Sequence, residues 1–510
     1  MHYFMGIDVG TSSLKACIVD AQGRTIADAS SRYQLVYPHP GWAEQDPTEW
    51  WDALAIAVRE LRASAGHAVV SALTAIGMTG QMHSLVALDA EGRPVRPAIS
   101  WTDQRSGDEC DYLREEHGDR VFQATGNPPS GAYTLTKLLW VRNHEPDRFR
   151  AIRWVVLPKD YVRYRLTGEI ATDPCDASAT LAYDPFSQTW AGELLTDLSI
   201  DPAIFPPVRE ATDQGGLVTR LAADQLGLPV GIPVYVGAGD AVAGRIGAGN
   251  VVGGTTAGLS LGSGALFINP SDSPLTDPAQ RVNLVCDGVR DKWIVMAATQ
   301  NSGLVIDWYL NKLARAYGRH ENPTERYRLA NEQAADVSPG SDGALFLPYL
   351  TGERCPHMDE NATGVFLGLR GRHTDAHLYR AVLEGIGFAL ADALSVIDEL
   401  GLRVDRVFAG GGGTGNNLLV SIIASALNRP VTVTPETNGT VLGAAAYARA
   451  GSGIAIDALS LDDPRFTTVL PDPAASDFYT NRLDLFRSAY RALKPFFREA
   501  AQQAAGGSLA

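Results

Sequence analysis

Two stretches of this chain, about half its length apart, share one design: an apolar strand, a tight turn and a second apolar strand. The first spans Gly6–Asp20 and turns at Gly10–Ser13, and the second spans Thr255–Asn269 and turns at Gly262–Gly264. Turns rich in Gly, Ser and Thr leave backbone N–H groups and hydroxyls free to converge on an anion. The repeat therefore predicts two related lobes whose turns face each other across a polyphosphate.

Size, charge and cysteine content narrow the class of protein. A chain of 510 residues is too long for one ordinary hydrophobic core, so we expect two or more domains. The formal net charge of −15 argues against nucleic acid or an anionic membrane as the main partner. Five widely spaced cysteines without a CxxC pair argue against a disulfide framework or a zinc site.

The same features favour a cytoplasmic protein. Such cysteine usage is typical of a reducing cytosol. The N-terminus enters a strand pattern at once, without the basic region and apolar run of a leader peptide. No stretch contains 18 consecutive apolar residues, so no membrane-spanning helix is expected.

Strand and helix patterns predict an α/β protein. The lobe boundary is expected in the Gly-rich stretch 247–258, which gives lobes of 1–247 and 255–490. Strands are expected at 3–9, 14–20, 25–29, 73–78, 85–88, 232–236, 293–297, 405–408 and 431–434. Helices are expected from Asp46, around 103–117 and 134–145, within 213–229, at 375–400 and 416–427, and near the C-terminus.

Asp8 closes the first strand, two residues before the turn. A carboxylate there can hold Mg²⁺, directly or through water, against phosphates bound by Thr11, Ser12 and Ser13. The alternative is an ordinary hairpin with Asp8 as a turn-capping residue. The second turn at Gly262–Gly264 weighs against that alternative, because a plain hairpin has no need to repeat this composition.

Asp240 is the one acid in the small-residue run Gly237–Gly244, which follows a strand. Small neighbours let a substrate approach closely, so Asp240 is a candidate acceptor for the proton of a substrate hydroxyl. Phosphoryl transfer asks the protein for little beyond such a base, positioning and charge neutralisation. The local sequence by itself favours another role, in which Asp240 caps a helix that begins near residue 241.

Two polar clusters fit a substrate with several hydroxyl groups. Gln81, Met82 and His83 follow a strand and combine hydrogen-bonding groups with an apolar floor. Trp101 and Asp103 belong to a second cluster with an aromatic wall. The alternatives are a structural histidine and an ordinary loop with a surface Asp–Arg pair.

The glycine run at 410–415 satisfies GxGxxG between an expected strand and an expected helix, and a further strand is expected to end near Glu436. This is the fingerprint of a dinucleotide site, and it keeps an NAD-dependent oxidoreductase open as an alternative. The other interpretation is a flat backbone surface on which an adenine ring lies. GxxxxGK[ST], VAIK, HRD and DFG are all absent, which excludes a P-loop and a protein-kinase fold.

Over essentially its whole length the chain resembles the FGGY carbohydrate kinases, most closely the xylulose kinases. The resemblance implies two actin-like (ribonuclease H-like) lobes with ATP and a sugar in a central cleft that closes on binding. It is carried by motifs that occur in one order: GIDVGTSSLK at 6–15, HPGWAEQDPTEWW at 39–51, GQMH at 80–83, WTDQR at 101–105, KLLWVRNHEP at 137–146, LPKDYVRYRLTGE at 157–169, GAGD at 237–240, LSLGSG at 259–264, LPYLTGERCPHMDENATGVFLGL at 347–369 and GGGG at 410–413.

The resemblance also implies residue roles. Asp240 matches the catalytic base, and Asp8 matches the acid associated with metal and phosphate. The sugar contacts implied or expected are Gln81, Met82, His83, Trp101, Asp103 and Asp240; the expected ATP contacts are Thr11, Ser12, Ser13, Gly262, Ser263, Gly264, Gly411, Gly412 and Asn416; the expected metal ligands are Asp8 and Asp240. Xylulose kinases usually carry Asn after the catalytic Asp, whereas this chain has Ala241, which removes a hydrogen bond to the sugar.

We therefore expect an ATP- and Mg²⁺-dependent kinase of a small sugar, with conversion of D-xylulose to D-xylulose 5-phosphate in pentose catabolism as the preferred reaction. Another ketopentose, a polyol or gluconate remains open as the substrate. An actin-like ATPase without a sugar substrate is an alternative of another class. The expected partners are the sugar and ATP, without nucleic acid or membrane, and a homodimer is an open assembly.

Overall fold

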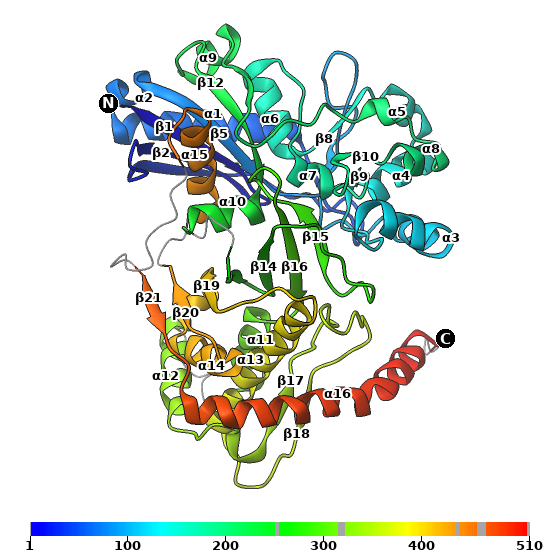
Figure 1. Ribbon diagram of the computed structural model, residues 1–510, viewed down its shortest axis with the longest axis vertical. Coiled ribbons are helices and arrows are strands. Elements are labelled where there is room, and N and C mark those ends of the chain that lie inside the picture. The colour runs from blue at the N-terminus through cyan, green and yellow to red at the C-terminus, as the bar shows by residue number, and fades with distance from the viewer. Residues whose placement is uncertain (1, 250–253, 315–321, 435–437, 456–465, 507–510) are drawn as a thin grey trace.

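The structure is a computed structural model that describes residues 2–249, 254–314, 322–434, 438–455 and 466–506. It contains two large mixed sheets, one from each half of the chain, and helices pack against both (Figure 1). The expected α/β class is confirmed.

Six strands form the first sheet. They lie in the order β11 (Gln214–Leu217), β12 (Pro233–Gly239), β5 (Leu73–Gly80), β1 (Tyr3–Val9), β2 (Ser13–Asp20) and β3 (Thr25–Arg32). β1 is antiparallel to β2 and parallel to β5, and β5 is parallel to β12. Three neighbouring parallel strands, β1, β5 and β12, therefore end at the same edge of the sheet.

The second sheet repeats the first and adds one strand. Its order is β15 (Asn283–Cys286), β16 (Trp293–Thr299), β14 (Ala265–Ser271), β13 (Thr256–Leu261), β19 (Arg406–Gly410), β20 (Val431–Val433) and β21 (Thr467–Val469). β13 is antiparallel to β14 and parallel to β19, which is parallel to β20. The repeat that the two turns predict thus extends to both sheets.

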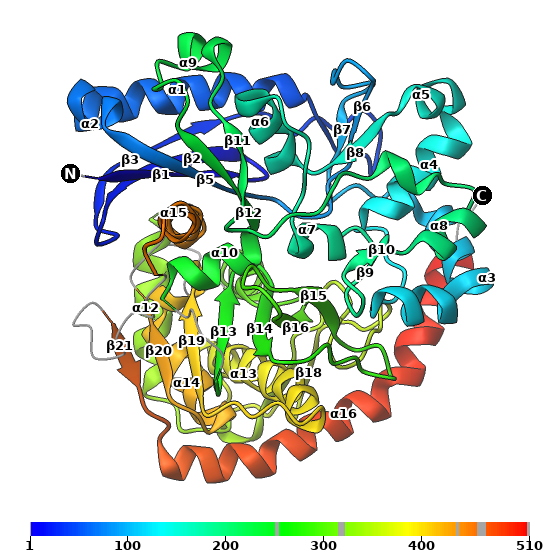
Figure 2. The same cartoon turned by 45° about the horizontal axis from the view of Figure 1, so that its top comes forward.

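Helices and short strands complete each half. The first half contains α1 (Pro47–Ala65), α2 (His67–Ser71), α3 (Gly107–Thr125), α4 (Thr134–His144), α5 (Pro146–Ala151), α6 (Pro158–Thr167), α7 (Pro174–Ser178), α8 (Gly192–Asp197), α9 (Arg220–Leu226), α10 (Asp240–Gly247), β4 (Glu44–Gln45), β6 (Val86–Leu88), β7 (Ala98–Ile99), β8 (Trp154–Val156), β9 (Tyr183–Asp184) and β10 (Thr189–Trp190). The second half contains α11 (Gly303–Trp308), α12 (Pro323–Ala335), α13 (Asp375–Glu399), α14 (Asn417–Leu427), α15 (Gly439–Gly451), α16 (Pro473–Gly506), β17 (Leu345–Leu347) and β18 (Val365–Leu367). Figure 2 shows α16 following the outer edge of the second lobe to the C-terminus.

Capping signals place several helices correctly. Asp46 caps α1, because its side chain accepts a hydrogen bond from the N–H of Thr48 at 2.9 Å. The helix expected around 103–117 is wrong in its bounds, since α3 begins at Gly107. The helix expected within 213–229 is α9, which begins after the N-cap Thr219, and the first part of this segment pairs as β11 with β12.

Two sequence expectations fall on residues that are not described. The strand end near Glu436 lies outside the described residues, and so do residues 250–253 of the expected lobe boundary. The division of the chain into 1–247 and 255–490 therefore stays a prediction.

Glycines seat α15 against the first sheet, although its sequence lies in the second half (Figure 1). A methyl group on Gly77 of β5 would lie 1.9 Å from the carbonyl oxygen of Ala444, and one on Gly6 of β1 would lie 2.1 Å from that of Val441. On its other side α15 meets α10 in the same way, because a methyl group on Gly443 would lie 1.9 Å from the oxygen of Ala243. Only glycine permits such approaches.

Membrane insertion by a helix finds no support. Within the described ranges, every helix is either too short or too polar to cross a bilayer.

We predict that Gly77→Ala lowers the free energy of unfolding by about 1–3 kcal/mol, because an overpacked contact forces α15 away from β5. Gly107→Ala at the start of α3 is the matched control, since nothing lies within 4 Å of the added methyl group. Urea unfolding followed by circular dichroism measures both. Equal midpoints for the wild type and Gly77→Ala would contradict the close packing of α15.

Candidate active site

Three strand ends bring the predicted residues of the first lobe together. Thr79 of β5 lies opposite Asp8 of β1 on one side and opposite Ala238 of β12 on the other. Gln81 and Asp240 each follow two residues further along their strands. The turn Gly10–Ser13 (the phosphate turn), the loop Gln81–Ser84 (the sugar loop) and the candidate base Asp240 therefore leave the sheet at one level.

Among the described residues, only one of the two carboxylate oxygens of Asp8 has a hydrogen-bond partner. Its Oδ2 accepts a hydrogen bond of 2.5 Å from Oγ1 of Thr440, whereas its Oδ1 is buried and has no hydrogen-bond partner among the described residues. Burial raises the pKa of Asp8, against the opposing effects of the Thr440 hydrogen bond and the charge of Lys15. A buried carboxylate oxygen without a partner is costly, so this atom fits a cation site.

Asp240 is the first residue of α10. Gly239 occupies the N-cap position, so Asp240 lies one residue inside the helix and not at the cap position that the local sequence favours. The surrounding protein raises the pKa of Asp240 to about 7, chiefly by desolvation and further through the negative charge of Asp8. Two acids that disfavour each other's ionisation in this way favour a proton or a cation between them.

Met82 and His83 follow β5, and Trp101 is bonded to the loop that carries them; we call these three residues the wall. A methyl group on Gly239 would lie 2.6 Å from Cγ of Met82, so Met82 touches the residue before Asp240. The His83 ring stands edge-on to the ring of Tyr133, with 5.0 Å between centroids. Trp101 is 38% exposed and is tied to the same loop. The wall combines an aromatic face, a thioether and an imidazole.

His83 is held as a neutral hydrogen-bond acceptor. Its Nδ1 lies 2.6 Å from the carbonyl oxygen of Ala179, so Nδ1 carries the proton and donates it. Burial lowers the pKa of His83 to about 4, and the charges of Lys137 and Arg354 lower it as well, against the opposing effect of the Ala179 hydrogen bond. Nε2 then carries no proton and is able to accept a hydrogen bond.

Two expected sugar contacts have other partners. Asp103 is wholly buried: its Oδ1 accepts hydrogen bonds from Arg105, and its Oδ2 accepts from the N–H of Ala43 and pairs with the same guanidinium at 2.8 Å. Its carboxylate is bonded by the protein and closed to solvent, and the expected sugar contact of Asp103 stays a prediction. Gln81 is 1% exposed, and its amide bonds to the phosphate turn and to Ser84. Gln81 is therefore buried beneath the site and supports it through these hydrogen bonds.

The second turn and the glycine run share a pocket of about 440 Å³. Of the residues expected to bind ATP, Gly262, Ser263, Gly412 and Asn416 line it. Gly264 closes the turn, since its carbonyl accepts a hydrogen bond from the N–H of Gly262 at 2.9 Å. The remaining residues of the lining are Gly303, Ile306, Asp307, Tyr327, Asn331, Gly413 and Gly415.

Gly411 and Asn416 shape this pocket. Gly411 has a φ of +99°, and a methyl group on it would lie 2.6 Å from the oxygen of Leu261 at the second turn, so glycine is required. Asn416 caps α14 by accepting a hydrogen bond from the N–H of Leu419 at 3.1 Å. Its Nδ2 is buried without a hydrogen-bond partner among the described residues, which leaves a donor for a bound nucleotide.

The surrounding sheet is not that of a dinucleotide-binding domain. The strand that feeds the glycine run, β19, lies between β13 and β20 in a sheet that also contains antiparallel pairs. A dinucleotide fold places its fingerprint on an essentially parallel sheet. The GxGxxG match at 410–415 therefore lies in a sheet of another kind, and the glycines that approach the second turn, Gly411 and Gly413, are not its three motif glycines.

Comparison with known proteins agrees with this geometry. Residues 3–247 match the N-terminal domain, and residues 257–451 the C-terminal domain, of the FGGY family of carbohydrate kinases. The chain belongs to this family.

The relatives of this carbohydrate kinase cover most of its length. It is 34% identical to the xylulose kinase of Escherichia coli (strain K12) over 96% of this chain and 99% of that protein. A crystal structure of xylulose kinase from Rhodospirillum rubrum superimposes with a TM-score of 0.89 at 34% identity, over 97% of this chain and 100% of that one. A gluconate kinase structure from Lactobacillus acidophilus gives a TM-score of 0.89 at 26% identity, over 96% and 98% of the two chains.

Family membership decides between the classes of protein left open by the sequence. The actin-like two-lobed fold is confirmed, and so is the resemblance to the FGGY kinases. The enzyme is a sugar kinase, with a sugar and ATP as its substrates. The oxidoreductase and the ATPase without a sugar substrate are set aside.

Sequence reasoning missed several residues of the site. Thr440 reaches Asp8 from α15, and only the turn signal Asn438-Gly439 before it hints at a helix start there. Arg354 lies near enough for its charge to help lower the pKa of His83 and to oppose the rise that burial causes in the pKa of Tyr133. It comes from the second half of the chain, so no local pattern connects it to the sugar loop.

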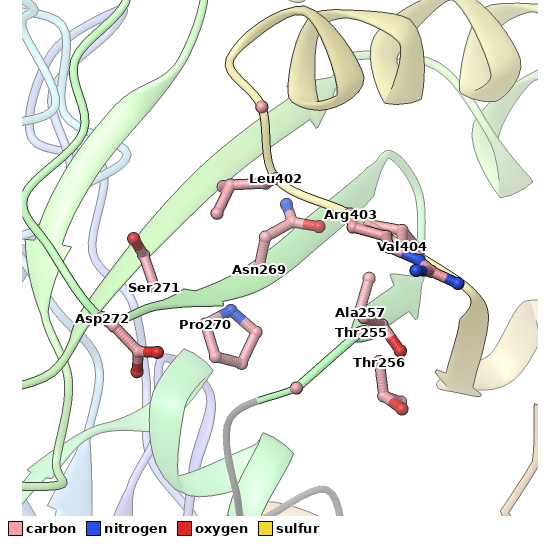
Figure 3. Close-up of a pocket in the computed structure, with 12 residues that line it drawn as sticks. Thr255, Thr256, Ala257, Asn269, Pro270, Ser271, Asp272, Leu402, Arg403 and Val404 are labelled. Carbon is pink, nitrogen blue, oxygen red and sulfur yellow. The ribbon is translucent and has the colours of Figure 1, made fainter.

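A second pocket, of about 170 Å³, lies at the other end of β13 and β14 (Figure 3). Asn269 and Arg403 are among its lining residues. None of the predicted site residues lines it, so it is separate from the catalytic centre.

The neutral state of His83 predicts sugar binding that does not change with pH. In an Asp240→Asn background, which removes the neighbouring titrating acid, the Kd for the sugar should stay constant between pH 5 and 8, because the pKa of His83 lies near 4. Isothermal titration calorimetry without nucleotide measures it. A loss of affinity below about pH 6.5, the ordinary histidine pKa, would contradict the assignment of Nε2 as a neutral acceptor.

Proposed function

We propose that this kinase transfers the γ-phosphoryl group of ATP to a small sugar, and that D-xylulose, giving D-xylulose 5-phosphate, is its preferred substrate. The observation that carries the proposal is the convergence of Asp8, Asp240 and the wall of Met82, His83 and Trp101 at one sheet edge. The names of the relatives at 34% identity support the choice of sugar.

Asp240 acts as the general base. As the hydroxyl oxygen of the sugar bonds to the γ-phosphorus, its proton passes to the carboxylate of Asp240. The bond between the γ-phosphorus and the bridging oxygen breaks, and its electron pair leaves with ADP. A pKa of about 7 suits this role, because the base then matches the working pH.

Asp8 and Asp240 fit a magnesium ion. The unpartnered Oδ1 of Asp8 and the like-charged Asp240 supply the carboxylate oxygens that Mg²⁺ prefers. Within the described residues no group of three or more acidic, His or Cys side chains is arranged to hold a metal ion, so phosphate oxygens and water would complete its shell. When bound, the ion neutralises charge on the phosphates.

The first lobe holds the sugar, whereas ATP contacts both lobes. Thr11, Ser12 and Ser13 of the first turn and Gly262, Ser263 and Gly264 of the second cradle the phosphates, while Gly411, Gly412 and Asn416 hold the adenosine. The sugar lies against Met82, His83 and Trp101. Closure of the lobes excludes water, which would otherwise accept the phosphoryl group.

Ala241 is the residue that bears most on the choice of sugar. It follows the base directly and is partly buried against Met82 and the apolar cluster around it. An asparagine amide here would reach a sugar hydroxyl, whereas a methyl group makes no hydrogen bond. The similarity to a gluconate kinase keeps gluconate as the second candidate.

Asp240→Asn should lower kcat by about 10²–10⁴-fold, the usual contribution of a general base. The Kd of a nonhydrolysable ATP analogue should change by less than about threefold, because the nucleotide pocket is untouched. Asp28→Asn, on the exposed face of β3, is the matched control and should keep full activity. Sugar phosphorylation by Asp240→Asn within tenfold of the wild type would remove Asp240 from the mechanism.

A screen of ADP release over ketopentoses, polyols and sugar acids tests the substrate. D-xylulose should give the highest kcat/KM. Ala241→Asn should raise kcat/KM for D-xylulose by about 2–10-fold, the worth of one added hydrogen bond. A higher kcat/KM for gluconate than for D-xylulose would overturn the choice of sugar and leave the kinase assignment intact.

A further inference from the structure

Six hydrogen bonds join the sugar wall to the phosphate turn: five close a ring through Thr11, and the sixth branches from Gln81 to Gly10. Two of them hold the turn directly: Nε2 of Gln45 donates to the carbonyl oxygen of Thr11 at 2.8 Å, and Nε1 of Trp101 donates to Oγ1 of Thr11 at 3.0 Å. The ring thus meets Thr11 twice, once at its backbone and once at its side chain.

Gln81 is the central member of the ring. Its Nε2 donates to Oε1 of Gln45 at 2.8 Å and to the carbonyl oxygen of Gly10 at 3.2 Å. Its Oε1 accepts from Oγ of Ser84 at 3.0 Å, and Oγ of Ser84 accepts from the N–H of Trp101 at 3.0 Å. Two acceptors face one end of the amide and a donor faces the other, so only one orientation satisfies all of them.

Of the five residues in the ring, Thr11 at the phosphate turn and Trp101 are not buried. Gln45, Gln81 and Ser84 are 2%, 1% and 1% exposed, whereas Trp101 is 38% exposed. A sugar that covers the Trp101 indole therefore contacts the ring at its one unburied side chain outside the phosphate turn. All members lie in the first half of the chain, so the ring acts within one lobe and independently of lobe closure.

We propose that Gln81 is a positioning residue through which an occupied sugar site holds the phosphate turn Gly10–Ser13 in its nucleotide-binding geometry. This inference rests on the proposed function, because it needs the sugar at Trp101 and the phosphates at the turn. A sugar bound at Trp101 then tightens ATP binding, and by linkage ATP tightens sugar binding by the same factor.

The test measures the Kd of a nonhydrolysable ATP analogue with Mg²⁺, with and without saturating sugar, by calorimetry. The sugar is whichever gives the highest kcat/KM in the screen. In the wild type the sugar should lower this Kd on the order of tenfold. Gln81→Glu keeps the size and the acceptor for Ser84 but loses both N–H donors, so the ratio should fall below about twofold.

Gln225→Glu is the matched control. Its side chain accepts a hydrogen bond from Nε1 of Trp51 at 3.1 Å, in the same half of the chain but outside the ring, and its ratio should equal that of the wild type. Trp101→Phe is a second test variant, which keeps an aromatic face and removes only the indole donor. It should also lower the ratio, and it decides the matter if Gln81→Glu does not fold.

Two outcomes overturn the inference: a wild-type ratio near one, or wild-type ratios in whichever of Gln81→Glu and Trp101→Phe fold. Failure of the proposed function looks different. It would be ADP release by the wild type that no sugar stimulates, whereas failure of the inference leaves sugar-dependent ADP release intact.

Discussion

Contact of backbone with backbone, made possible by glycine, is the constraint on which the catalytic centre depends. Gly6 and Gly77 let α15 lie directly on β1 and β5, and Gly443 lets α10 lie directly on α15. Thr440 at the start of α15 then reaches Asp8, while α10 begins with Asp240. The spacing of the two acids is therefore set by helices that side chains of ordinary size would hold apart.

Like charge and burial give the acid pair its chemistry. Asp8 loses water without gaining a partner for Oδ1, and its charge helps to raise the pKa of Asp240. The arrangement is unfavourable for an empty site and favourable for one that contains a cation and a hydroxyl proton. The acid pair therefore contributes less to the free energy of unfolding than an apolar pair would. Its catalytic role explains why the protein keeps this unfavourable arrangement.

Local patterns in the sequence predicted strands, turns and the position of Asp8 and Asp240 well. They predicted them because strand alternation, turn residues and N-caps are set within a few residues. The partners of Asp103 and Gln81 could not be predicted, since Ala43 and Gln45 come from a distant part of the chain. Thr440 and Arg354 were missed for the same reason. Asp240 lies in the first turn of α10 and not at its N-cap, because β12 extends to Gly239. The end of β12 is set by its pairing with β5, which the local sequence does not show.

The position of α15 also bears on how the protein is made. The first sheet is complete once Gly239 has left the ribosome, but the helix that covers Gly6 and Gly77 ends at Gly451. Until then the glycine-lined face of β1 and β5 stays bare, and the carboxylate of Asp8 lacks its hydroxyl donor. During synthesis the first lobe must therefore wait for almost the whole of the second, so the two halves mature as one unit.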